Sequence, residues 1–203
     1  MLAFFAVTQV HGAVSRQQAL DAFRVAQAAA VEPKATSPAQ RQLAPPDQTQ
    51  WAENRIMAYR ASLQAPPVLP QGVLRIESLA LEVPIFADTS ELNLNRGVGW
   101  IEGTDTPGET GNVGIAGHRD GFFRVLKDIS VGDVIDVESL SGPTRYRVAE
   151  TFIVEPEDVY VLDRTTEPSL TLVTCYPFYF VGHAPQRFIV RGVLVDADSG
   201  ADG

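Results

Sequence analysis

The chain has 203 residues, of which 45% are hydrophobic and 20% charged, with a net charge of −9 and a single cysteine. This length suits one domain with an appendage and is enough to bury a hydrophobic core. One cysteine excludes an intrachain disulfide and a multi-cysteine zinc or iron–sulfur site, and the acidic balance argues against nucleic acid as a partner.

Glycine and charge divide the chain near residue 72. Residues 1–71 contain one of the sixteen glycines, with six basic and four acidic residues. Residues 72–203 contain the other fifteen glycines, with ten basic and twenty-one acidic residues. We therefore expect a helical or loose N-terminal arm, followed by a glycine-rich, β-rich domain that carries the acidic charge.

The chain begins with an apolar run, MLAFFAV, within residues 1–14. The run is shorter than the roughly 20 apolar residues that cross a membrane. No basic residue precedes it and no small-residue cleavage site is clear, so it does not fit a standard signal peptide. Two interpretations stay open: a frayed N-terminus and the C-terminal end of a membrane anchor.

The rest of the arm contains two predicted helices. Residues 15–30 favour the first, because Ser15 and Gln18 have the spacing of a capping box. Residues 32–47 carry four prolines and small polar residues, which is typical of a linker. The second helix is expected over about 48–64, where apolar side chains recur along one face.

From residue 72 onward, short apolar runs alternate with turns, which is the pattern of a β-rich domain. A hairpin turn is predicted at 141–143, and only residues 122–129 favour a short helix. Many strands with few helices predict an all-β fold, either a closed barrel or a sandwich. The expected strands are 73–76, 79–85, 112–118, 133–138, 144–154, 169–175 and 187–195.

Three polar residues stand at strand ends in this domain: Cys175, His118 and Arg187. A lone cysteine ending an apolar strand is most often a buried small hydrophobic residue, and a lone His or Arg is most often a surface group. If the strand that ends at Cys175 and the strand that begins at Arg187 are antiparallel neighbours, these two residues lie side by side. If the strand ending at His118 runs parallel to the first of them, His118 reaches the same rim.

These three side chains suffice for acyl transfer through a thioester. A thiolate is the nucleophile, and a cationic neighbour such as an imidazolium favours its formation near neutral pH. The imidazolium of His118 then protonates the leaving amine. Arg187 does not deprotonate, so its donors suit substrate carbonyls and the oxyanion of the tetrahedral intermediate.

The motif TLVTC at 171–175, followed after twelve positions by an arginine and preceded by GHRD at 117–120, resembles the sortases, the cysteine transpeptidases of bacterial surfaces. The resemblance covers about 72–195. The surrounding sequence is most similar to class D sortases. Further matching segments are GVGWIEGT at 97–104, GNVGIAGHRDGFF at 111–123, TCYPFYFVG and APQRF.

The resemblance implies a closed eight-stranded sortase-type β-barrel with short helices over 72–196, with no cofactor and no metal ion. It makes Cys175 the nucleophile, His118 the general acid and Arg187 the group that stabilises the substrate and the oxyanion. Thr174 corresponds to the family threonine that helps to position the bound peptide.

The resemblance also implies the reaction and its location. Sortases cut proteins that bear a C-terminal sorting signal of the LP-x-T-G or LP-x-T-A kind after the threonine, hold the product as a thioacyl-enzyme, and pass it to an amine of the cell envelope. They are normally anchored in the cell membrane at the N-terminus, with the catalytic domain outside the cytoplasm. On this interpretation residues 1–14 end an anchor, 15–71 form a membrane-proximal arm, and 197–203 are a flexible C-terminal tail.

Some alternatives stay open. Asp120 is suited either to orienting His118 or to capping the short helix that follows, and His183 matches no motif position of the family. The aromatic loop 176–186 either lines the peptide groove or packs on the barrel rim. Two other functions are a peptidase that hydrolyses the thioester with water, and a non-catalytic β-barrel binding module in which Cys175 is buried.

Overall fold

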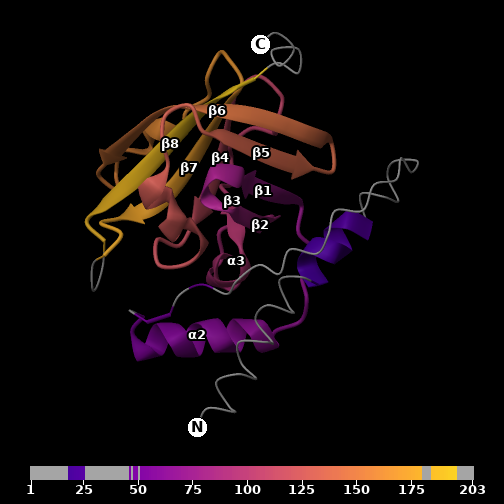
Figure 1. The fold of residues 1–203 in the computed structure, drawn as a ribbon, viewed down its shortest axis with the longest axis vertical. Coiled ribbons are helices and arrows are strands. Elements are labelled where there is room, and N and C mark those ends of the chain that lie inside the picture. The colour runs from indigo at the N-terminus through magenta and orange to yellow at the C-terminus, as the bar shows by residue number, and fades with distance from the viewer. Residues whose placement is uncertain (1–17, 26–45, 47, 50, 180–183, 196–203) are drawn as a thin grey trace.

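The computed structural model describes residues 18–25, 46, 48–49, 51–179 and 184–195. In this part of the chain eight strands close into a barrel, which confirms the predicted fold class (Figure 1). The strands are β1 (Gly72–Ile76), β2 (Leu81–Phe86), β3 (Val98–Trp100), β4 (Asn112–Gly117), β5 (Val134–Ser139), β6 (Gly142–Val154), β7 (Ser169–Tyr176) and β8 (Gln186–Leu194). The helical segments that accompany them are α2 (Glu53–Gln64), α3 (Glu91–Arg96) and the 3-10 turns η1 (Glu77–Leu79), η2 (Phe122–Asp128) and η3 (Val159–Leu162).

The strands pair in the order β1-β2-β3-β4-β7-β8-β6-β5, and β5 closes the ring against β1. The pairs β2–β3 and β4–β7 are parallel, and the other pairs are antiparallel. A parallel pair needs a long connection, and the chain from β4 to β7 supplies it by passing through η2, β5 and β6. The parallel pairing of β4 with β7 brings two strand ends that are distant in sequence to the same rim.

Side chains that point into the barrel form one hydrophobic core, as the alternation of apolar residues along each strand requires. Tyr146 is fully buried there, and its hydroxyl accepts a hydrogen bond from the backbone N–H of Gly108 at 3.1 Å. The buried polar group is therefore satisfied. The core includes Leu74, Ile76, Val83, Ile85, Val113, Ile115, Phe123, Leu126, Ile135, Val137, Leu170, Leu172 and Val190.

The predicted strands agree with the observed ones to within two residues, and two turns account for most of the differences. Leu79 lies in η1, and the strand begins only after Ala80, whose left-handed φ of 50° turns the chain. The predicted turn at 141–143 is wrong: Gly142 already pairs with Ser139, so the hairpin loop is two residues long. The φ of 121° at Gly142 is the reason a glycine stands there.

The sequence analysis predicted neither β3 nor α3. β3 has three residues, too few for a periodic pattern, and it contains Gly99. A Cβ atom at Gly99 would lie 2.2 Å from the backbone oxygen of Asp88, so a close backbone approach requires the glycine. α3 has six residues and is likewise too short for helical periodicity to reveal it.

The arm packs against the barrel where the structure describes it. Residues 18–25 of the predicted first helix are helical, and Leu20 and Phe23 bury their side chains against Val73 of β1. Arg24 of the same segment forms an ion pair with Glu82 of β2 at 2.7 Å. Residues 1–14 and 197–203, the predicted anchor end and tail, lie outside the described residues.

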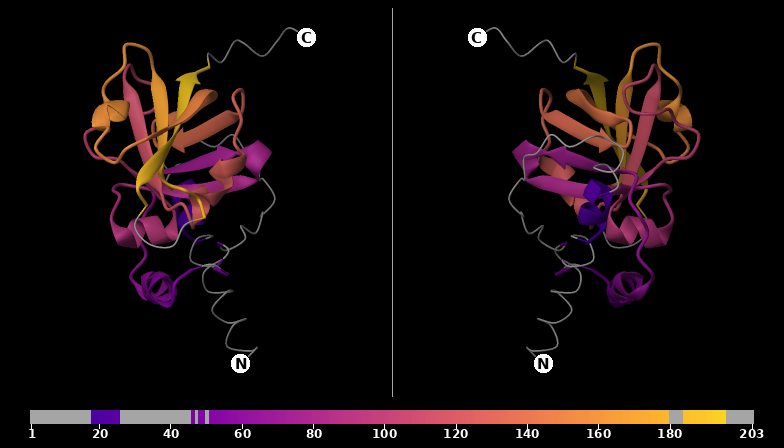
Figure 2. Two further views of the ribbon diagram at one scale, coloured as in Figure 1. Left: turned by 90° about the vertical axis from the view of Figure 1, so that its left-hand side faces the viewer. Right: turned by 90° about the vertical axis from the view of Figure 1, so that its right-hand side faces the viewer.

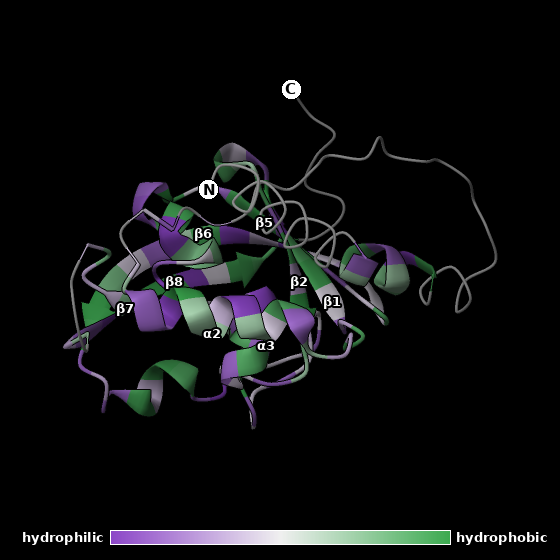
Figure 3. Ribbon diagram, turned by 90° about the horizontal axis from the view of Figure 1, so that it is seen from below, coloured by the Kyte–Doolittle hydropathy of each residue, from purple (hydrophilic) through white to green (hydrophobic). Residues whose placement is uncertain are grey.

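The second predicted helix begins later than expected, at Glu53, because Ala52 before it is extended and the backbone N–H of Trp51 donates to the oxygen of Gln48 at 3.1 Å. α2 runs below the barrel beside α3, as the views from the sides and from below show (Figures 2 and 3). Arg96 of α3 caps the end of α2 by donating hydrogen bonds to the backbone oxygens of Ser62, Ala65 and Pro66. None of the helices in the described ranges is long and apolar enough to span a bilayer.

Asn112 at the start of β4 is a buried polar link that holds β4, β7 and the loop before β7 together. Its amide nitrogen donates to the backbone oxygen of Val161 at 3.0 Å, and its oxygen accepts from the Thr171 hydroxyl at 2.7 Å. Asn112→Ala removes the 2.7 Å acceptor of the buried Thr171 hydroxyl and one of the donors to Val161, so we expect a loss of about 2 kcal/mol in the free energy of unfolding. Urea denaturation measures it, with the exposed amide variant Gln64→Ala as the control. A loss no larger than that of the control would contradict this role.

Candidate active site

The three predicted site residues meet at one rim of the barrel. β4 and β7 pair in parallel with Gly117 opposite Thr174, so the next residues, His118 and Cys175, leave the sheet side by side. β7 and β8 are antiparallel, and Cys175 is the direct partner of Arg187. Both pairings predicted from the sequence are therefore confirmed.

The alternation of side chains along the strands shows that Cys175, His118 and Arg187 also lie on the same face of the sheet. Leu172 of β7 belongs to the barrel core, whereas Val173 packs outside it against the smaller cluster that contains Ile189 of β8. Side chains two positions apart point the same way, so Cys175 lies on the outer face with Val173, and Arg187 lies there with Ile189. By the same alternation His118 lies on that face, because Ile115 of β4 points inward.

Cys175 is a free thiol that is only partly buried. A cysteine kept as a core hydrophobe would sit inside the barrel with Leu170 and Leu172, which are completely buried. The placement of Cys175 on the outer face, next to a cationic side chain from β8, is the environment in which a thiol can act as a nucleophile.

His118 is largely enclosed, with 23% of its side chain exposed. Its Nε2 lies 3.4 Å from Oε1 of Glu91. Burial, and then the positive charge of Arg55, lower the pKa of His118 below the ordinary histidine value, while Glu91 and Asp120 oppose this shift. The imidazole is consequently mostly neutral at pH 7.

This pKa shift predicts a pH-dependent contribution to stability. Between the lowered pKa of folded His118 and the ordinary value of about 6.5 in the unfolded chain, the unfolded state binds more protons. The stability contributed by neutral His118 is thus complete above about pH 6.5 and is lost as the pH falls towards the folded-state pKa. Urea unfolding at pH 7.5 and 5.5 should show a larger decrease for the wild type than for His118→Gln. Equal decreases would refute the shift.

Arg187 is held by the backbone of its own loop. Its Nη1 donates to the oxygens of Gln186 at 3.0 Å and Ala184 at 3.3 Å. Within the part of the chain that the structure describes, no carboxylate forms an ion pair with Arg187. The guanidinium therefore keeps donors and its charge for a substrate carbonyl or an oxyanion.

Thr174 lies on the opposite face from Cys175. Its side chain is 2% exposed, and its hydroxyl donates to the backbone oxygen of Gly117 at 2.8 Å. This bond ties the end of β7 to the residue that precedes His118. The role of Thr174 in positioning a peptide stays a prediction, while its contact in this structure aligns the nucleophile strand with the histidine strand.

Asp120 does not cap the short helix. Gly121 occupies the position before η2, which has no side-chain cap. The Asp120 carboxylate instead lies 3.4 Å from Nε of Arg55 in α2, and its backbone oxygen accepts the Trp51 indole N–H at 2.8 Å. His183 lies outside the described residues.

In the described part of the loop after Cys175, the rings of Tyr176 and Phe178 pack on the barrel rim. Tyr176, Phe178 and Phe188 form a cluster of ring contacts with centroids 5.2 to 6.4 Å apart. Arg119, the neighbour of His118, donates to the backbone oxygen of Pro177 at 3.0 Å and so joins the histidine loop to the cysteine loop. Tyr179 is exposed, and the Arg124 guanidinium lies 5.4 Å from its ring centroid.

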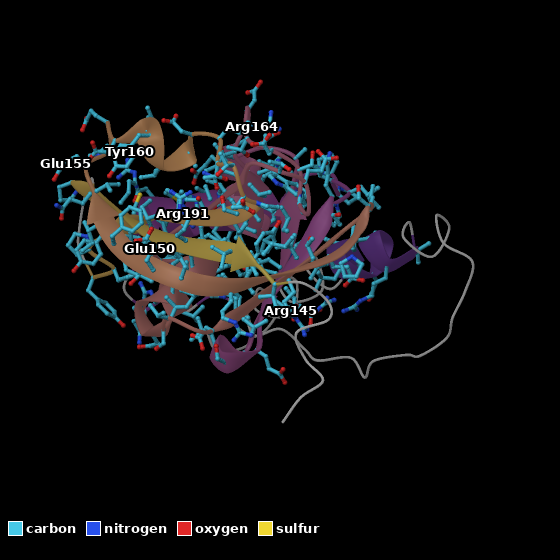
Figure 4. The ribbon with its side chains drawn as sticks, turned by 90° about the horizontal axis from the view of Figure 1, so that it is seen from above. Arg145, Glu150, Glu155, Tyr160, Arg164 and Arg191 are labelled. Carbon is cyan, nitrogen blue, oxygen red and sulfur yellow. The ribbon has the colours of Figure 1, made fainter. Side chains whose placement is uncertain are left out.

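The loop before β7 covers the outer face beyond this site. Arg191 of β8 donates to the backbone oxygen of Val161 in η3 at 2.9 Å. Figure 4 shows Arg191 grouped with Glu150 and Tyr160 on that side of the barrel. The loop is thereby fixed close to the strand that carries Arg187.

Two further observations on the described residues concern metal ligands and a cavity. No group of three or more His, Cys, Asp or Glu side chains in these ranges is arranged to hold a metal ion. A cavity of about 420 Å³ lies between residues 18–22, α2, α3 and the barrel, but Cys175, His118 and Arg187 do not line it. The cavity is therefore separate from the face on which these three residues lie.

Glu91 and Arg55, which face His118, and Asn95 and Trp51, which contact them, were not predicted from the sequence. Glu91 and Asn95 stand one turn apart on α3, and Trp51 lies just before α2, four residues before Arg55. Such spacing is common in any helix, so the sequence held no signal that separates these residues from other surface groups.

Comparisons with known proteins agree with this geometry. The sortase domain family matches residues 74–195. The chain is 34% identical to sortase D of Bacillus subtilis (strain 168) over 67% of this chain and 69% of that protein. It is similar to the Clostridium perfringens sortase D5 transpeptidase structure, with 27% identity, a TM-score of 0.57, and coverage of 73% of this chain and 91% of that one. Sortase C1 of GBS pilus island 1 shares the fold over 93% of this chain and 96% of that chain, with a TM-score of 0.65 and 23% identity.

Proposed function

Because the chain belongs to the sortase family of cysteine transpeptidases, with class D similarity, we propose that it cleaves a C-terminal sorting signal of the LP-x-T-G or LP-x-T-A kind and transfers the protein to an amine of the cell envelope. The observation that carries this proposal is the direct pairing of Cys175 with Arg187, with His118 beside Cys175 on the parallel strand. A thiol, an imidazole and a guanidinium are together on one face, and these groups can serve as nucleophile, acid and oxyanion donor.

In the proposed first step neutral His118 takes the proton of the Cys175 thiol, and in the resulting ion pair the thiolate attacks the carbonyl carbon of the signal threonine. Arg187 donates hydrogen bonds to the oxyanion that forms, and the His118 imidazolium gives its proton to the leaving amine as the C–N bond breaks. The product is a thioacyl-enzyme and a peptide that begins with the glycine or alanine of the signal.

In the second step the amino group of the acceptor attacks the thioester carbonyl. Neutral His118, left by the first step, takes the proton of the attacking amine, and Cys175 departs as the thiolate. The new amide carries the protein, and the enzyme returns to its starting protonation state. Water in place of the amine would give hydrolysis, so the acceptor decides between transpeptidase and peptidase.

A peptide panel tests the proposal. Purified enzyme is incubated with LP-x-T-G and LP-x-T-A peptides, with and without a glycine-based amine, and the products are identified by mass spectrometry. We expect a thioacyl adduct on Cys175 and, with amine present, a ligated peptide. Hydrolysis at the same rate with and without amine would favour the peptidase, and no cleavage of either peptide would overturn the proposal.

We also propose that the enzyme acts outside the cytoplasm, held at the cell membrane through its N-terminus. The apolar run MLAFFAV and the net positive arm support this location. Membrane fractionation of cells expressing the protein, followed by protease treatment of intact protoplasts, tests it. A soluble protein, or one that is protected from protease in intact protoplasts, would contradict the location.

A further inference from the structure

The neighbourhood of His118 contains an acidic partner that the proposed mechanism has not used. Nε2 of His118 is buried and makes no hydrogen bond in the structure. The group it faces is the Glu91 carboxylate, whose Oε1 is 3.4 Å away, within ion-pair range. A modest side-chain adjustment when His118 takes up a proton would convert this contact into a charge-assisted hydrogen bond, as catalytic contacts often tighten during reaction.

Glu91 is held in this position although 61% of its side chain is exposed. Asn95, one helical turn later, donates from its amide nitrogen to Oε1 of Glu91 at 3.3 Å. Asn95 is buried, and its own amide oxygen accepts a hydrogen bond from Arg55 of α2. A chain of contacts thus runs from the arm through α3 to the histidine.

Arg55 is itself fixed from two sides. Its guanidinium lies 4.2 Å from the ring centroid of Trp51, which packs edge-to-face against Tyr59. Nε of Arg55 faces the Asp120 carboxylate, and the Trp51 indole N–H is bonded to the Asp120 backbone. The guanidinium of Arg55 bonds Asn95, faces Asp120 and stacks on an indole at the same time. Only a planar group with several donors can do this, so a lysine cannot replace it.

We propose that Glu91 is a positioning residue for His118, and that the arm holds Glu91 in place through Arg55 and Asn95. A proton bound on Nε2 facing Glu91 leaves Nδ1 as the nitrogen that exchanges a proton with the substrate. The charged or titratable groups around His118 are Arg55 on α2, Glu91 on α3, Asp120 after β4, Cys175 on β7 and Arg187 on β8. The arm is therefore part of the catalytic machinery, an inference that rests on the proposed role of His118.

The variant Glu91→Gln tests the contact, because it removes the charge and keeps the shape. We expect the pKa of His118 to be lower in Glu91→Gln than in the wild type, as measured by NMR titration. The His118 resonances are identified by their absence from the spectrum of His118→Gln. We expect kcat to fall about fivefold to tenfold with unchanged KM. This loss is small compared with the rate enhancement of about 10²–10⁴-fold that a general acid supplies. The control is Glu102→Gln, an exposed carboxylate in the loop after β3.

The NMR titration needs no substrate, so it separates this inference from the proposed function. If the wild type cuts no signal peptide, the proposed function fails while the His118 pKa still tests Glu91. A His118 pKa in Glu91→Gln equal to that in Glu102→Gln would overturn the proposal. A kcat of Glu91→Gln equal to that of Glu102→Gln would also overturn it.

Coupling between the arm and Glu91 is tested by a double-mutant cycle with Arg55→Lys. If Arg55 acts through Glu91, the double variant Arg55→Lys/Glu91→Gln loses no more kcat than the more impaired single variant. Losses that multiply would show that the arm does not act through Glu91. Arg60→Lys, exposed on the same helix, controls for the change of side chain.

Discussion

Cys175→Ala should abolish signal-peptide cleavage, with a loss of about 10⁴-fold or more in kcat/KM, as expected when a covalent nucleophile is removed. Neither the imidazole of His118 nor the guanidinium of Arg187 can form the thioacyl bond in its place. The substitution removes one sulfur atom from a partly exposed position on the outer face, so the barrel core is untouched. Steady-state kinetics with the signal peptide, and mass spectrometry of the intact protein, measure the effect.

The single cysteine makes the accompanying control unambiguous. Any alkylation of the native protein by iodoacetamide reports on Cys175, because the chain has no other thiol. We expect alkylation of the wild type at neutral pH to stop cleavage in proportion to the fraction labelled. Cleavage that persists in fully alkylated enzyme or in Cys175→Ala would eliminate the thioester mechanism. A large drop in melting temperature of Cys175→Ala would make the kinetic result uninformative, so thermal unfolding is measured in parallel.

Arg187→Ala is expected to lower kcat by about 10²–10³-fold, the usual effect of losing one oxyanion donor. Arg187 is the cross-strand partner of Cys175, and its Nη1 is anchored on two backbone oxygens. The guanidinium thus has little conformational freedom, and its remaining donors are available to an oxyanion. Arg187→Lys should recover little activity, because a single ammonium cannot both hold the loop and reach the oxyanion.

The matched control for this prediction is Arg145→Ala. Arg145 is an exposed arginine of β6 that pairs with Asp136, and Figure 4 shows it well apart from Glu155 and Tyr160. Its replacement makes the same change in net charge, and we expect kcat to stay within twofold of the wild type, because a surface ion pair is worth about 1 kcal/mol or less to stability. Equal losses in the two variants would mean that overall charge, and not the local donor, explains the effect of Arg187.

The site triad was predictable because it depends on only two strand pairings. A loop of about eleven residues between two strong apolar strands favours antiparallel neighbours, which places Cys175 opposite Arg187. The position of His118 required the further hypothesis of a parallel pair, and the register of β4 and β7 confirms it. Cys175, His118 and Arg187 each stand at one end of a strand that the sequence pattern indicates, and this was enough to predict both pairings.

The partners of His118 could not be predicted in the same way. Glu91 and Asn95 lie on a six-residue helix that has no readable periodicity, and Arg55 reaches the site from the arm. For Asp120 the sequence left open orienting His118 or capping the helix, and the docked α2 provides a cationic partner that the local sequence does not reveal. The hydrogen bond from the Thr174 hydroxyl to the backbone oxygen of Gly117 was also not predicted, because it depends on the pairing of two strands that are distant in sequence.

The order of amino acids alone indicates the all-β class, the division into arm and barrel, the strand positions and the meeting of Cys175, His118 and Arg187 at one rim. These follow from local alternation, turn residues and a motif, all of which are written in short stretches of sequence. The tertiary structure decided which carboxylate faces His118, that Thr174 points inward, and that the arm contacts the active site. Such contacts join segments far apart in the chain, and they depend on how helices dock on a closed barrel, which no local pattern encodes.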